Sequence, residues 1–314
     1  MDKSVPVMIR GQRVGKLRAS WLLFKETWRY LQTDREMLVL PLLAALMSLV
    51  LVGFLVFVFV LSGGREVLSR LASEDFSVLG WLFVFGCYVI VAFTMATSQA
   101  GISHAVYTRA HSGDSTLGQS LKIAFSHWPS LLLWSMITST VGVFLQMIVE
   151  KSRLLGRLFS LLLGSAWSVL TYFVVPAMVI DKKTAFESIS KSTQVFKATW
   201  GETIVSNVTL GAVFLIAHVL MLVSMIGLVI ACAVSNLITP MFVIFAVNVA
   251  LLLLAILIQS TMEGILKTLL YIYASESAYP ANFNQELLEQ MLVRQNPPMT
   301  ASTIPTQVPP FAQT

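Results

Sequence analysis

Residues 171–202, TYFVVPAMVIDKKTAFESISKSTQVFKATWGE, contain the three kinds of segment from which most of the chain is built. An apolar helix ends at Ile180, a charged exit follows at residues 181–183, and an amphipathic segment leads towards the next apolar run. In that segment apolar and polar side chains recur on opposite faces at helical spacing, with Phe186, Ile189, Phe196 and Trp200 on one face and Glu187, Lys191, Gln194 and Lys197 on the other. This order favours a membrane protein whose spans are joined by helices lying in the headgroup layer.

The composition supports that interpretation. Hydrophobic residues make up 56% and charged residues 12% of the 314 residues, whereas a soluble domain has about 45–50% and 25%. A membrane-crossing helix needs about 20 apolar residues, and six runs meet this length. We therefore expect a membrane domain at 1–278 with spans at about 37–61, 78–107, 131–149, 158–180, 204–233 and 241–273. The remainder, 279–314, is predicted to be a cytoplasmic tail with a short helix at 282–294 and a disordered, proline-rich end.

Short related segments precede three pairs of spans. Residues 20–28 (SWLLFKETW) and 192–200 (STQVFKATW) share five of nine residues, and 121–128 (LKIAFSHW) is a weaker third copy. Each lies in a predicted interfacial amphipathic helix, at about 16–31, 115–128 or 184–200. The aromatic residues expected to face the membrane there are Trp21, Phe24, Trp28, Phe125, Trp128, Phe196 and Trp200. The predicted fold is all-α: a polytopic bundle of six transmembrane helices in three parallel repeats, each led by a cytoplasmic interfacial helix.

The distribution of basic residues predicts the orientation. With six spans both termini lie on one side, which carries 16 Lys and Arg residues against five on the other. The positive-inside rule then places both termini in the cytoplasm. The net charge of +5 suits anionic lipid headgroups, and no basic block suggests nucleic acid. We expect a multi-pass protein of the bacterial cytoplasmic (inner) membrane.

Few side chains suggest chemistry. The mid-span polar residues Asn207, His218 and Asn248 most simply form hydrogen bonds between helices, and the alternative is that they line a shared polar cavity. Pro176 is predicted to kink the fourth span. The spacing of the acidic and histidine side chains around residues 104–127 matches no metal-ligand pattern. No catalytic motif is present, so the sequence predicts no catalytic, cofactor-binding or metal-binding residue.

The last apolar helix is unusually long. It has no helix breaker between Met241 and Pro280, so it would measure about 54 Å at 1.5 Å per residue, well beyond the ~30 Å hydrocarbon core. We therefore expect it to bend or to project into the cytoplasm past Ile258. Glu263 and Lys267, four residues apart, are then expected to be a solvated pair on the projecting part.

Several segments resemble an uncharacterised bacterial family of six-span membrane proteins. The resemblance rests on residues 172–181 (YFVVPAMVID), 196–202 (FKATWGE) and 269–274 (LLYIYA), with Pro280 and Phe283, and it extends to about Leu292. More distantly, the chain is similar to the membrane domain of some glycerophosphodiester phosphodiesterases and to YciC-like inner-membrane proteins. The catalytic barrel of those enzymes is absent from this sequence, so the resemblance implies a fold and a location but no activity.

Two classes of function follow from these observations. The first is a non-enzymatic scaffold, envelope-homeostasis factor or partner subunit that contacts membrane lipids and either another protein or further copies of itself. The alternative is a transporter or lipid-handling protein with a cavity between its helices. An intramembrane enzyme would need a convergent acid–base or metal set, and the sequence offers none.

Overall fold

The computed structural model describes residues 7–9, 12–14, 16–64, 66–67, 77–111, 113–151, 155–235 and 238–276. Nearly all of this is helix; a short antiparallel hairpin pairs strand β1 (Val7–Ile9) with β2 (Gln12–Val14). The predicted tail helix at 282–294 and the proline-rich end lie outside the described residues. The helices, in chain order, are α1 (Lys16–Thr33), the 3₁₀ helix η1 (Arg35–Leu38), α2 (Val39–Leu61), α4 (Val78–Ala110), α5 (Leu117–Ser126), α6 (Trp128–Lys151), α7 (Leu155–Leu170), α8 (Val174–Ile180), α9 (Ala185–Val234) and α10 (Ile238–Glu276).

Six segments are long and apolar enough to cross a membrane, which confirms the predicted number of candidate spans. They are Arg35–Leu61, Val78–Ala110, Trp128–Val149, Gly156–Ile180, Val213–Cys232 and Thr239–Ser275. The third predicted interfacial helix is not separate from its span, because 184–200 and 204–233 belong almost entirely to the single helix α9. Gly201 is the only glycine near the expected junction, and one glycine inside a helix costs only about 1 kcal/mol.

The fourth span is interrupted beside Pro176. Helix α7 ends at Leu170 and α8 begins at Val174, so Pro176 lies in the first turn of α8, where its missing N–H costs little. The interruption leaves two backbone groups without helical partners, and Ser192 of α9 bonds both. Its hydroxyl donates to the Leu170 carbonyl (2.8 Å) and accepts from the Phe173 N–H (3.0 Å). One side chain of α9 thus stabilises the break between α7 and α8.

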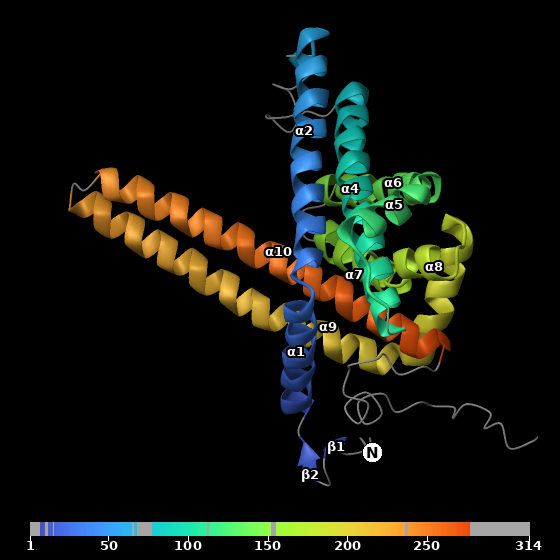
Figure 1. Cartoon of the computed structure of the whole chain (residues 1–314). Helices are drawn as coiled ribbons and strands as arrows, with labels where there is room; N and C mark the ends of the chain where they lie inside the picture. The colour runs from blue at the N-terminus through green and yellow to red at the C-terminus, as the bar shows by residue number, and fades with distance from the viewer. Residues whose placement is uncertain are drawn as a thin grey trace, which may run out of the picture.

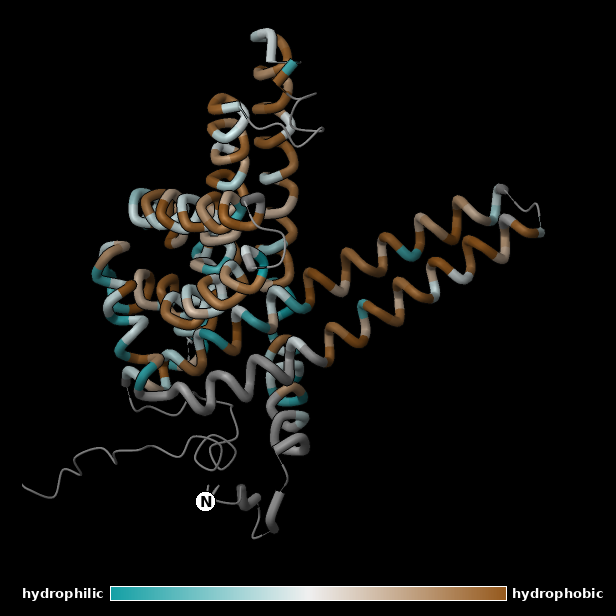
Figure 2. The backbone as a smooth tube through the Cα atoms, turned by 180° about the vertical axis from the view of Figure 1, so that it is seen from behind, coloured by the Kyte–Doolittle hydropathy of each residue, from teal (hydrophilic) through white to brown (hydrophobic). Residues whose placement is uncertain are grey.

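The helices form two contrasting regions (Figure 1). The α9–α10 hairpin extends to one side, away from the other helices, while α2 and α4 extend together in a different direction. We call the outer part of this hairpin, residues 213–234 and 239–257, the arm. It is apolar along both helices (Figure 2), and its large side chains are mostly exposed. Because the other described residues leave these side chains uncovered, lipid is the environment that suits them.

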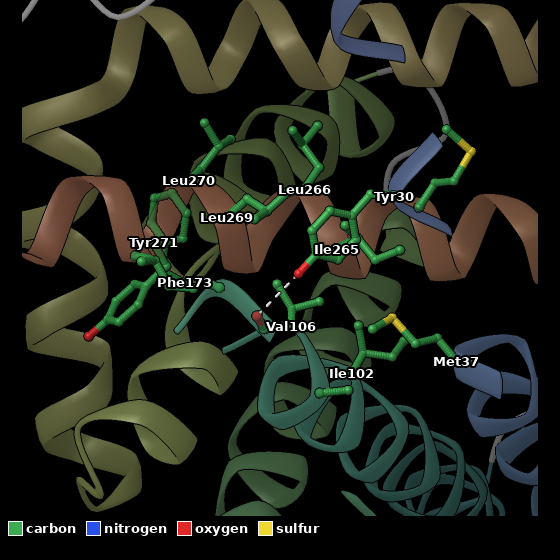
Figure 3. Packing of buried hydrophobic residues seen from close by; sticks show 14 of the residues in the cluster. Tyr30, Met37, Ile102, Val106, Phe173, Ile265, Leu266, Leu269, Leu270 and Tyr271 are labelled. Carbon is green, nitrogen blue, oxygen red and sulfur yellow. Dashed lines mark hydrogen bonds between the residues drawn. The ribbon is translucent and has the colours of Figure 1, made fainter. Parts of the chain in front are cut away.

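The inner ends of the helices pack together into a region that we call the hub. It is defined by the buried residues of α1, η1, α4, α5, α6 and α8, by Leu40 of α2 and Phe173 before α8, and by the inner parts of α9 and α10. Its largest cluster joins Phe173, Leu266, Leu269 and Tyr271 to residues of α1 and α4 (Figure 3). The Tyr30 hydroxyl of α1 donates to the Val106 carbonyl of α4 (3.4 Å).

The last helix, α10, is buried in the hub beyond Ile258. Helix α10 continues without interruption to Glu276, and its residues beyond Ile258 are among the most buried of the described chain. The prediction of a solvated projection is therefore wrong, because α1, α4, α8 and α9 all pack against this part of α10.

Candidate functional site: a polar chamber in the hub

Polar side chains of α4 and α10 meet inside the hub. The hydroxyls of Ser103 and Thr268, both fully buried, lie 3.0 Å apart. The Gln99 amide donates to the Ser103 hydroxyl and to the Gly264 carbonyl, each at 3.4 Å. A Cβ atom at Gly264 would lie 3.0 Å from Gln99 Oε1, so the close approach of Gln99 to α10 depends on a glycine there.

Two adjoining hollows lie beside these polar contacts. One, of about 410 Å³, is lined by residues of α4, α6, α7, α8 and α10 and of the link between α7 and α8. The other, of about 370 Å³, is lined by residues of α4, α6, α8 and α10. Both volumes fall within the about 300–1,000 Å³ of small-molecule sites. The residues lining both hollows are Gln99, Trp134, Val175, Glu263 and Lys267. We call the two hollows together the chamber.

The chamber holds two opposite charges within the last candidate span. Glu263 and Lys267 are half-buried, and no ion pair joins them in the described part of the chain. The Glu263 carboxylate accepts from the Gln259 amide at 2.8 Å, and the Lys267 ammonium lies 5.1 Å from the centroid of the Tyr172 ring. Charged side chains within a span are costly and usually face a cavity or mark a functional site.

Aromatic rings form part of the chamber wall. Trp134 of α6 lines both hollows and stacks on Trp167 of α7, with ring centroids 5.9 Å apart. Tyr172, between α7 and α8, lines the first hollow beneath Lys267. Aromatic faces of this kind attract cations, so the chamber offers a carboxylate, an ammonium group and π-faces to one ligand.

The borders of both hollows include exposed residues. Met95, which lines the α4 side, is 45% exposed on a candidate span. Ser168, which lines the α7 side, is also exposed. The chamber therefore combines a polar interior with an edge on the apolar outer surface of α4.

Two of the three polar residues that the sequence suggested for a cavity, His218 and Asn248, lie away from the chamber. Asn248 belongs to the arm, where its amide donates to the Ile244 carbonyl (3.0 Å) and its oxygen accepts from Ser224 of α9 (3.4 Å). His218 Nδ1 lies 2.6 Å from the Phe214 carbonyl oxygen, and its buried Nε2 has no hydrogen-bond partner among the described residues. The side chain of Asn207 lies outside the described residues. Neither His218 nor Asn248 lines the chamber.

The predicted membrane-facing aromatic residues have different environments. Trp21, Phe125 and Trp128 are exposed, as a residue in the headgroup layer would be. Phe24 and Trp28 are partly buried against the hub, and Phe196 is fully part of it; the side chain of Trp200 lies outside the described residues. Trp21 also stacks on Phe24, with ring centroids 5.2 Å apart.

A cluster of ion pairs lies at the inner end of α4. The Arg109 guanidinium lies 3.5 Å from the Asp34 carboxylate and 3.1 Å from that of Asp114. Burial raises the pKa of Asp34, and the charge of Arg109 partly opposes that rise. Among the described residues no group of three or more His, Cys, Asp or Glu side chains could hold a metal ion. The cluster instead connects η1 to the α4–α5 loop.

Sequence reasoning missed the chamber because it treated Glu263 and Lys267 as a solvated pair. A signal was present. The charges lie four residues apart in an uninterrupted apolar helix, beside Gly264 and Thr268. Small and hydroxyl residues at such spacing are typical of tight contacts between membrane helices.

Comparison with known proteins gives a family but no described activity. The family model described as "Family of unknown function (DUF6159)" matches residues 77–280, which include every residue that lines both hollows. No curated protein and no solved structure matches the chain, so nothing supports the resemblance to glycerophosphodiester phosphodiesterase membrane domains or YciC-like proteins. On the match over 77–280, this chain belongs to the DUF6159 family of unknown function.

Proposed function

We propose that this protein is a lipid-handling membrane protein that receives the polar part of an amphiphile in the chamber. The observation that carries this proposal is the pair of opposite charges, Glu263 and Lys267, in two adjoining hollows, one of which reaches the apolar surface of α4 at Met95. A polar headgroup would compensate these charges, while acyl chains would remain against the exposed outer faces of the spans.

This proposal favours the lipid-handling alternative over a pure scaffold. A scaffold needs no polar hollow inside its helices, and replacing a buried pair of charges by well-packed apolar residues is often neutral or stabilising in such a bundle. The proposal includes the location predicted from the basic residues: a bacterial cytoplasmic membrane, with both termini and the inner face of the hub on the cytoplasmic side. It includes no covalent step.

Native mass spectrometry of the full chain, extracted gently with its own lipids, tests the proposal. We expect the wild type to retain a lipid in stoichiometric amount and the Lys267→Met variant to lose it. Lys122→Met is the matched control, since Lys122 is exposed on α5 and does not line the chamber, and it should retain the lipid. A wild-type chain that retains no lipid and carries another protein instead would contradict the proposal and favour the scaffold.

A further inference from the structure

The two charges of the chamber are arranged so that each remains available to a ligand. Side chains four residues apart on a helix have Cβ atoms about 5–6 Å apart on the same face, and Glu263 and Lys267 line the same two hollows. They form no ion pair with each other in the described structure. Their formal charges sum to zero, so a ligand of net charge zero would leave the chamber electrically balanced.

The cationic end of the chamber suits a phosphate. Lys267 extends over the Tyr172 ring at 5.1 Å, and none of the described hydrogen bonds is donated by its ammonium group. An ammonium group has three donors and binds phosphate oxygens as a point charge.

The anionic end suits an ammonium group. The Glu263 carboxylate accepts one described hydrogen bond, from Gln259, and a carboxylate can accept several more. Trp134 lines the same hollows, and indole faces are the strongest π-partners of ammonium ions. A carboxylate and an indole together would hold an ammonium group without an additional charge.

Resting on the function proposed above, we propose that the chamber selects a zwitterionic headgroup, with its phosphate ester at Lys267 and its ammonium group at Glu263 and Trp134. The shared chemistry is a phosphate ester and an ammonium group in one small molecule, carried either by a membrane lipid or by its free water-soluble headgroup. A singly charged anionic headgroup would satisfy Lys267 alone and would leave Glu263 facing like charge.

The test offers the full-length protein phosphatidylethanolamine and phosphatidylglycerol with identical acyl chains and measures retention by native mass spectrometry. We expect the zwitterionic lipid to be retained about tenfold better, the effect of one charge-assisted hydrogen bond. Glu263→Gln keeps the shape of the side chain but removes its charge, so it should abolish this preference while phosphatidylglycerol is still retained. Glu187→Gln, at an exposed helix start outside the chamber, should leave the preference unchanged.

The outcomes separate this inference from the function on which it rests. Equal retention of the two lipids by the wild type, or an unchanged preference in Glu263→Gln, overturns the zwitterion inference but leaves the lipid-handling proposal standing. Retention of neither lipid overturns both, unless soluble glycerophosphoethanolamine binds in their place. In that case the zwitterion chemistry holds and the lipid source is rejected.

Discussion

The hub and the arm are built from the same kinds of helices, but the hub buries its large side chains and the arm exposes them. In the hub, side chains as large as Phe173 and Tyr271 are fully buried, and polar groups such as Ser103 and Thr268 bond to one another across helices. In the arm, α9 and α10 contact each other while residues such as Phe242, 64% exposed, face outward.

Specificity for a ligand can therefore arise in the hub but not in the arm. Exposed apolar side chains of the arm are interchangeable, because lipid tails are as apolar as they are. The hub carries the packing and the polar contacts that define a shape, and the chamber lies there.

Truncating a buried aromatic residue of the hub should cost the most stability. Phe173→Ala should destabilise the protein by about 3–5 kcal/mol, because it leaves a cavity, whereas Phe242→Ala in the arm should cost little. Thermal unfolding of the full chain in lipid nanodiscs measures both. Equal losses would show that the arm is packed against protein.

A charge placed in the arm should be the next most costly change. Val223 is 62% exposed near the middle of a candidate span, so Val223→Lys should oppose insertion by about 2.5–3.5 kcal/mol. Phe186→Lys, at the exposed start of α9, should have a much smaller effect. The yield of membrane-integrated protein compares the two variants, and similar yields would contradict a lipid environment for the arm.

Two glycines give a matched pair of smaller effects. A Cβ at Gly264 in the hub would lie 3.0 Å from Gln99 Oε1 and 3.1 Å from Ile102, so Gly264→Ala should cost about 1–3 kcal/mol through overpacking. A Cβ at Gly227 in the arm would meet nothing within 4 Å, and Gly227→Ala should stabilise the helix by up to about 1 kcal/mol. Shifts of the unfolding midpoint in opposite directions in the two variants would support the contrast. A lower midpoint in both variants would contradict it.

The smallest expected effect is a pH dependence at the inner end of α4. Burial raises the folded-state pKa of Asp34 above its ordinary 3.8, so folding favours the protonated carboxyl. The stabilisation from Asp34 is present below pH 3.8 and is lost as the pH rises through the raised folded-state pKa. Asp34→Asn should flatten the pH dependence of the unfolding midpoint across this window. An unchanged pH dependence in this variant would rule out a contribution from Asp34.

The number of candidate spans could be predicted from the sequence, because apolar runs of this length are typical of transmembrane helices. It also placed the charged exit after Ile180. It could not reveal that α10 remains buried beyond Ile258, because a long apolar helix with one charged pair is equally compatible with projection and with burial. The environment of Glu263 and Lys267 is formed by Gln99, Trp134 and Tyr172, which come from distant parts of the chain.

The cavity predicted at Asn207, His218 and Asn248 illustrates the same point. These residues stand out in the sequence because their surroundings are apolar, yet Asn248 bonds Ser224 within the arm. Local polarity identified residues that need a partner. It could not identify where helices leave space between them.

Site-specific photo-crosslinking can detect whether an amphiphile enters the chamber. A benzophenone amino acid would replace Tyr172 in the chamber, Leu222 on the exposed arm and Tyr271 in the closed core of the hub. We predict lipid adducts at positions 172 and 222 and none at 271, detected by mass spectrometry of the full chain in its native membrane. Adducts at 222 alone would show that lipid surrounds the protein without entering it, and would contradict the account.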